Sequence, residues 1–180
     1  MPKMQYFDPF PGNRGDELGN MASYRKNPHR GSDWGIKKAI ENKPIKAITN
    51  GRVKKIFWSD VLGHCVVQSS GDGYYWLYAH LANPTPLKLN DILVGGQTVL
   101  GAVGGGAKTP SGSASTGAHL HMAGCKASAG LNVHLVNYNK LVDVHKYIDA
   151  NKNPVAKSAA VPEVVEVVEE DEVETAEAQP

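Results

Sequence analysis

Turn residues interrupt the chain between 45 and 103 so often that no long helix fits there. Residues 64–69 (HCVVQS) and 74–80 (YYWLYAH) are rich in the β-branched and aromatic side chains that favour strands. The Gly-Asp-Gly sequence at 71–73 separates them as a turn. This pattern predicts a mainly β, antiparallel fold, with the aromatic run at 74–80 in its core.

Other segments extend this prediction in both directions along the chain. We expect a hairpin at residues 45–57, because apolar residues alternate on both sides of the Asn-Gly pair at 50–51. Short strands are expected within 87–103 and at 119–123. The apolar spacing within 139–150 predicts one short helix.

Charge and composition divide the chain into three parts. Residues 1–24 are an extended lead-in, residues 25–152 are the folded domain, and residues 153–180 are an acidic, flexible tail. All 19 lysines and arginines precede residue 158, whereas residues 158–180 hold eight of the 18 Asp and Glu residues. The basic body suits an anionic surface, such as nucleic acid or a teichoic-acid-bearing cell wall, or is a solvated lysine-rich surface.

The first residues, the apolar stretches and the cysteines lead to further expectations. The first residues lack the apolar core of a secretory signal, and no stretch is apolar enough to insert into a membrane. Cys65 and Cys125 form no CxxC pair. We expect two buried thiols rather than a disulfide.

Histidines are the side chains that point to chemistry. His29 and Asp33 lie four residues apart, and His119 and His121 share one face of a predicted strand. Catalytic zinc takes three protein ligands from His and Asp or Glu and keeps one position open. His29, Asp33 and one histidine of the His119–His121 pair supply that set. The other histidine of the pair is left to move protons, and His80 could provide a second such group.

Several alternative sites are excluded by their motifs. No H-E-x-x-H occurs, residues 101–109 fail the phosphate-binding-loop pattern, and residues 112–115 are not a nucleophile elbow. His64, His134 and His145 have no partner pattern, and we interpret them as packing or surface residues.

Three motifs in order resemble those of the lysostaphin-type (M23, LytM-like) peptidoglycan endopeptidases. They are HRGSD at 29–33, YAHL at 78–81 and STGAHLHM at 115–122, and the stretch at 89–105 is similar as well. The resemblance covers roughly residues 25–150. It implies an antiparallel β-sheet of the duplicated-hybrid-motif type, with few short helices and a groove walled by loops.

The resemblance also implies roles for single residues. His29, Asp33 and His121 match the zinc ligands of the family, with one Zn²⁺ per chain. His80 and His119 match the catalytic histidines that handle protons and stabilise the tetrahedral intermediate.

The implied activity is hydrolysis of peptide cross-links or stem peptides of bacterial peptidoglycan, at a D-alanine–diaminopimelate link rather than a glycine bridge. The alternative is a non-catalytic wall-binding, activator or virion structural module. We expect a monomer that binds peptidoglycan and no nucleic acid, with a possible docking partner for the acidic tail. Without a signal, the protein would be made in the cytoplasm and reach the wall as a phage endolysin released by lysis or as a virion component.

Two departures from the family pattern bear on the groove. Trp34 and Gly35 stand where smaller apolar residues are common, which predicts a different shape near the metal. The loop at 104–115 is longer than usual, which would change substrate choice.

Overall fold

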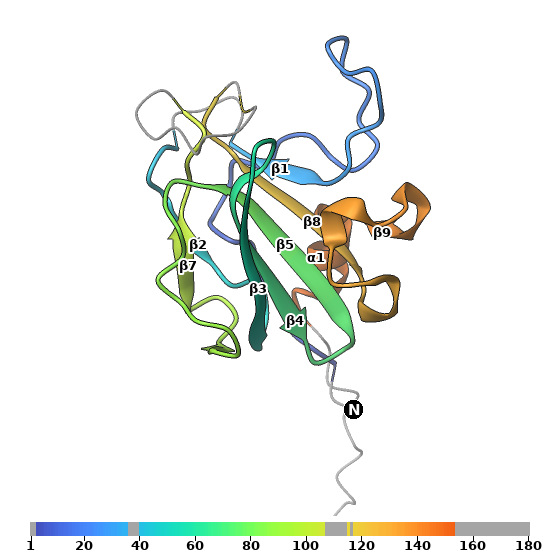
Figure 1. The fold of residues 1–180 in the computed structure, drawn as a ribbon. Helices are drawn as coiled ribbons and strands as arrows, with labels where there is room; N and C mark the ends of the chain where they lie inside the picture. The colour runs from blue at the N-terminus through green and yellow to red at the C-terminus, as the bar shows by residue number, and fades with distance from the viewer. Residues whose placement is uncertain (1–2, 36–39, 107–114, 116, 154–180) are drawn as a thin grey trace, which may run out of the picture.

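A curled antiparallel sheet dominates the structure (Figure 1). The computed structural model describes residues 3–35, 40–106, 115 and 117–153. The main sheet has seven strands, in the order β1 (Ser32–Trp34), β8 (Leu120–Lys126), β5 (Tyr74–Leu81), β4 (Gly63–Ser70), β3 (Gly51–Ser59) and β6 (Ile92–Leu93), with β9 (Leu141–Val142) paired to β8. A second sheet pairs β2 (Pro44–Lys46) with β7 (Val99–Ala102). The predicted mainly β, antiparallel class is confirmed.

The central strands form where the sequence predicts them. β4 and β5 pair across the turn at residues 71–73, and β5 then pairs with β8. β8 begins at Leu120, one residue after the predicted start, and runs three residues further. Hydrogen bonding between adjacent strands therefore places the segments at 74–80 and 119–123 side by side.

The predicted hairpin at residues 45–57 is wrong. β2 pairs with β7 in the small sheet, whereas β3 pairs with β4 and β6. The Asn50 side chain accepts a hydrogen bond from the Gly95 amide at 2.8 Å, so it joins two loops. At Gly51 a Cβ atom would collide with the Ser69 carbonyl oxygen, so this glycine permits close strand approach rather than a tight turn.

The predicted helix is shorter than the segment 139–150. α1 spans Val144–Asn151, and the Asp143 carboxylate caps it by accepting from the Lys146 amide at 3.2 Å. The apolar residues at 141 and 142 form β9 instead. Three short 3₁₀ helices precede them: η1 (Ala127–Ala129), η2 (Val133–Leu135) and η3 (Tyr138–Lys140).

Each face of the main sheet packs into a separate core. Trp76 and Tyr78 of β5 belong to the core that includes α1 and the small sheet, as predicted for this aromatic run. Leu77 and the two cysteines face the other core, beneath the 3₁₀ helices. Cys65 and Cys125 are buried and free, in agreement with the expectation of two thiols. Each fully buried large side chain stabilises the fold by about 1.5–3 kcal/mol.

The N-terminal segment packs against the domain. Tyr6 and Phe10 are buried in the first core, and the Phe7 amide donates to the Ile48 carbonyl at 2.8 Å. Residues 3–24 therefore share their core with residues 25–152. Apart from Asn153, the expected acidic tail lies outside the described residues. Among the described residues, no helix has the length and apolarity to cross a membrane.

Candidate functional site

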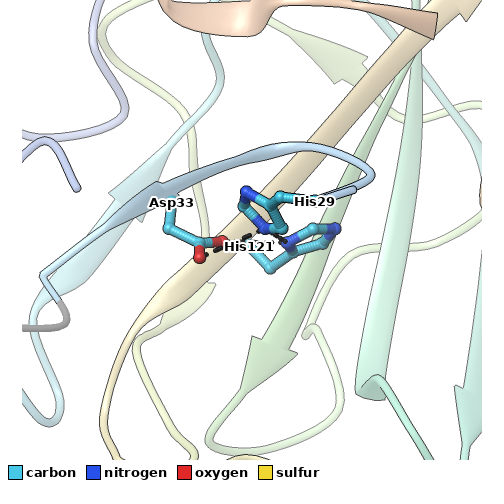
Figure 2. Close-up of side chains that lie close together, drawn as sticks. All are labelled: His29, Asp33 and His121. Atoms are coloured by element: carbon cyan, nitrogen blue, oxygen red, sulfur yellow. Dashed lines mark hydrogen bonds and ion pairs between the residues drawn. The ribbon is translucent and has the colours of Figure 1, made fainter. Parts of the chain in front are cut away.

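Three predicted ligands meet at the edge of the main sheet (Figure 2). Asp33 of β1 lies opposite His121 of β8 in the strand register, and His29 approaches from the segment that precedes β1. Asp33 Oδ1 lies 2.9 Å from His121 Nδ1, and Asp33 Oδ2 lies 3.2 Å from His29 Nε2. The third pair, His29 Nε2 and His121 Nδ1, is 3.2 Å apart. The structure thus brings His29, Asp33 and His121 together.

The donor set fits a zinc ion. Ligands about 2.0–2.1 Å from a tetrahedral zinc lie roughly 3.3 Å from one another, which is close to the separations observed. Burial opposes ionisation of Asp33, but hydrogen bonds and charges from His121 and His29 hold the pKa of its carboxyl group well below its usual range. Asp33 is therefore an anion at neutral pH, as a metal ligand must be.

The tautomer of His29 is set by the N-terminal segment. His29 Nδ1 donates to the Glu17 carbonyl oxygen at 3.0 Å, which leaves Nε2 with its lone pair toward Asp33 and His121. Two backbone hydrogen bonds, Gly15 to the Asp33 carbonyl and Asp33 to the Asp16 carbonyl, are each 2.8 Å. Residues 15–17 therefore run beside β1 and support the ligands.

Gly31 allows the His29–Asp33 segment to lie against β8. A Cβ atom at Gly31 would lie 2.8 Å from His121 Nε2 and would collide with the Met122 carbonyl oxygen. Only glycine permits this approach. The glycine between the two ligands therefore has a steric role in the site.

His80 is positioned by an irregularity in β5. Its φ angle is +60°, and the β4–β5 register shifts between His64 and Val66. A bulge of this kind redirects a side chain, and a non-glycine residue in the left-handed region is held there at an energetic cost. The His80 ring centroid lies 4.5 Å from that of His119 and 6.1 Å from that of His121. The structure thus brings both predicted catalytic histidines beside the ligands.

His119 and His80 are neutral bases at physiological pH. His119 Nδ1 donates to the Gly117 carbonyl at 2.9 Å, which leaves Nε2 as a proton acceptor. Burial lowers the pKa of His119, partly offset by Asp33. Burial, assisted by His119 and His121, lowers the pKa of His80 to about 3. A bound cation would lower both pKa values further.

These groups open into a cleft of about 740 Å³. Trp34 and Gly35 do not line it, so any effect of these two residues on the shape of the groove would be indirect. Trp34 is fully buried on the opposite face of β1, with its ring 4.4 Å from that of His145. The residues around the opening are Tyr24, Arg25, Pro28, His29, Arg30, Asp33, Val61, Leu62, His80, Ser115, Gly117, His119 and His121. Residues 107–114, most of the loop expected to change substrate choice, lie outside the described residues.

Several functional neighbours were not predicted from the sequence. Tyr24 and Arg25 line the cleft, yet they lie outside every motif. Glu17 contacts His29 through its backbone carbonyl group, and the residue type gives no sign of such a contact. His145, interpreted as packing or surface, is buried, and its Nε2 donates to the Asp33 carbonyl at 3.1 Å. Only the adjacency of β1 and α1 in three dimensions identifies that contact.

Comparisons with known proteins agree with this geometry. Residues 27–133 match the model of peptidase family M23. The structure of LytU superimposes with a TM-score of 0.61 at 26% identity, covering 83% of this chain and 94% of that one. A catalytic-domain mutant of the prophage-encoded M23 protein EnpA from Enterococcus faecalis gives 0.57 at 28%, covering 74% and 95%.

A third similar structure is the antimicrobial peptidase lysostaphin from Staphylococcus simulans, with a TM-score of 0.60 at 20% identity. The match covers 90% of this chain and 60% of the lysostaphin chain, and it supports a similarity in fold. The family match extends over more than half of the chain and contains all five predicted site residues. The chain belongs to peptidase family M23.

Proposed function

We propose that this M23 peptidase is a zinc-dependent endopeptidase that hydrolyses peptide cross-links or stem peptides of bacterial peptidoglycan. One observation carries the proposal: an open set of three ligands lies beside two neutral histidines in a cleft large enough for a peptide. The similarity in fold to lysostaphin, described as an antimicrobial peptidase, supports the choice of substrate.

Each residue of the site has a defined task. His29, Asp33 and His121 would hold one Zn²⁺ per chain. Bound there, the ion would polarise the scissile carbonyl and acidify a water molecule. His119 accepts a proton at Nε2 and later donates it to the leaving amine, because the Gly117 carbonyl fixes its tautomer. His80, 4.5 Å from His119 between ring centroids, donates a hydrogen bond to the developing oxyanion.

The three-ligand set favours an enzyme over a wall-binding or virion structural module. Structural zinc is normally enclosed by four protein ligands, whereas catalytic zinc keeps a position free. His80 and His119 lie beside the ligand cluster without belonging to it. A purely structural site would have no use for two neutral bases beside its ligands.

Digestion of purified peptidoglycan tests the proposal. The full chain is incubated with the wall with and without a zinc chelator, and the fragments are analysed by mass spectrometry. We expect new amine termini within the peptide portion, chelator-sensitive release, and restoration of activity by added zinc. Binding to the wall without fragments would favour the non-catalytic alternative.

We further propose that the protein acts as a phage lysin, released at host lysis or carried on a virion. The support is the 28% identity to EnpA, which is described as prophage-encoded. Mass spectrometry of purified virions and of lysates from the producing strain tests this origin. Detection of the protein only in uninfected cells that lack a prophage would contradict it.

A further inference from the structure

An arginine in the cleft has no task in the proposed chemistry. Arg25 Nη2 donates to Asp16 Oδ2 at 3.0 Å and to the Tyr24 hydroxyl at 3.3 Å. It also lies 3.7 Å from Oδ2 of the ligand Asp33. Since Tyr24 bonds to the same Asp16 oxygen at 3.0 Å, the guanidinium is held at a fixed place on the cleft wall.

Part of the hydrogen-bonding capacity of Arg25 is unused. Its Nε is buried without a partner, and Nη1 bonds to none of the described residues. The Nη1 group therefore keeps donors that an incoming anion can use. The planar guanidinium is suited to paired hydrogen bonds with a carboxylate.

The charge balance of the cleft also favours an anion. Arg25 and Arg30 both line the cleft, and the carboxylates that pair with Arg25 are those of Asp16 and Asp33. When a dication occupies the ligand set, the charge of Asp33 is directed to the metal, and Arg25 keeps only Asp16 as a counter-ion. A substrate carboxylate beside the reacting amide would then meet the positive potential of both Arg25 and the dication.

We propose that Arg25 is a specificity-determining residue that binds a carboxylate attached next to the scissile amide. This inference rests on the proposed peptidase function and narrows its substrate class.

In a D-alanine–diaminopimelate cross-link, the carbon that bears the amide nitrogen also bears a carboxylate. In a glycine bridge that carbon bears only hydrogen and a further amide. The distance of 3.7 Å from Arg25 to a metal ligand suits the first arrangement, because the carboxylate carbon lies only two bonds from the nitrogen of the reacting amide.

Two synthetic substrates isolate this contact. Both contain the D-alanine–diaminopimelate link, and they differ only in that the neighbouring group is a carboxylate in one and a carboxamide in the other. The values of kcat and KM are measured for both with the zinc-loaded full chain, with Arg25→Gln, and with Arg52→Gln as the matched control. Arg52 is exposed on β3 and belongs to a different cavity.

We expect the unaltered protein to favour the carboxylate by about tenfold to a hundredfold in kcat/KM, mainly through KM, as one charge-assisted pair provides. Arg25→Gln should lose this preference, because its kcat/KM falls more on the carboxylate than on the carboxamide, and Arg52→Gln should retain it. Equal kcat/KM of the unaltered protein on both substrates would overturn the proposal. An equal fall in kcat on both substrates with Arg25→Gln would also overturn it, because Arg25 would then only position Asp33.

Calorimetric binding of the same two peptides separates this inference from the peptidase function. If neither peptide is cleaved, the proposed activity fails. A binding preference for the carboxylate that disappears in Arg25→Gln would still support the role of Arg25. Equal binding of both peptides would reject it.

Discussion

The Glu17 carbonyl oxygen accepts a 3.0 Å hydrogen bond from Nδ1 of the metal-ligand candidate His29. Glu17 precedes the region that matches the family model, which begins at residue 27. The orientation of the first ligand therefore depends on a segment outside the family motifs. This relationship leads to the first prediction.

Deletion of residues 1–20 should damage both the fold and the metal site. The deletion removes the buried Tyr6 and Phe10 and the Glu17 acceptor. Loss of such an outer partner typically weakens metal binding about 10–100-fold, and loss of two buried aromatic residues removes several kcal/mol of stability, at ~3–5 kcal/mol each. Thermal denaturation and zinc titration measure the two effects. An unchanged Tm and zinc affinity would show that the segment is dispensable.

Asp33→Ala should abolish zinc binding and wall hydrolysis together. The substitution removes the single carboxylate of the ligand set and leaves His29 and His121 without their shared partner. Elemental analysis of the purified variant gives the zinc content, and turbidity of a wall suspension gives the activity. Zinc at one ion per chain in this variant would contradict the ligand assignment.

His119→Gln should keep the zinc and lose turnover. His119 donates to the Gly117 carbonyl and is not one of the three clustered ligands. Removal of a general acid or base typically lowers kcat by about 10²–10⁴-fold. The comparison of zinc content with kcat checks this. Wall hydrolysis at the unaltered rate would assign proton transfer to another group.

Gly31→Ala should weaken the metal site, and Gly15→Ala should not. A Cβ at position 31 would lie 2.8 Å from His121 Nε2, whereas one at position 15 would lie at an ordinary 3.5 Å from the Asp33 carbonyl. Overpacking of this kind costs about 1–3 kcal/mol. Zinc affinity and urea denaturation of the two variants provide the test. Equal effects of the two substitutions would exclude the steric explanation.

The chelated, metal-free protein should lose stability as the pH falls below 6.5. The pKa of His80 is about 3 in the fold, against an ordinary 6.5, so the unfolded chain binds this proton first. Through His80 the free energy of unfolding then falls by about 1.4 kcal/mol for each pH unit of acidification, and this fall ends near pH 3. Urea denaturation between pH 7 and 4.5 measures the slope for the unaltered protein and for His80→Gln. Identical slopes would mean that His80 is not held neutral.

The sequence was sufficient for the strands that carry the site. Residues 64–69 and 74–80 have β-branched and aromatic side chains over the length of a strand, and each is a strand in the structure. Alternation also placed His119 and His121 toward one cleft, which both residues line. Local signals were adequate because β4 and β5 are consecutive in the chain, and because the two histidines need only the alternation of their own segment to share a face.

The predictions were wrong where a residue contacts a segment that is distant in the sequence. The Asn-Gly pair at 50–51 is typical of a hairpin, but here Asn50 bonds to the Gly95 amide and Gly51 makes room for Ser69. Leu141 fits the spacing of a helix, yet it pairs with Cys125 of β8. The contacts of Arg25 and Glu17 with the site depend on the path of the N-terminal segment, which has no periodic pattern.

The separation of Asp33 and His121 along the chain has a consequence for how the protein is assembled. These partners are 88 residues apart, and strands β3, β4 and β5 lie between them along the chain. Closing such a loop costs entropy that local contacts cannot repay early in folding. In zinc fingers the ligands are close in sequence and the ion drives folding. We therefore expect the ligand candidates of this chain to meet late in folding, so that a metal ion would bind to a nearly finished scaffold.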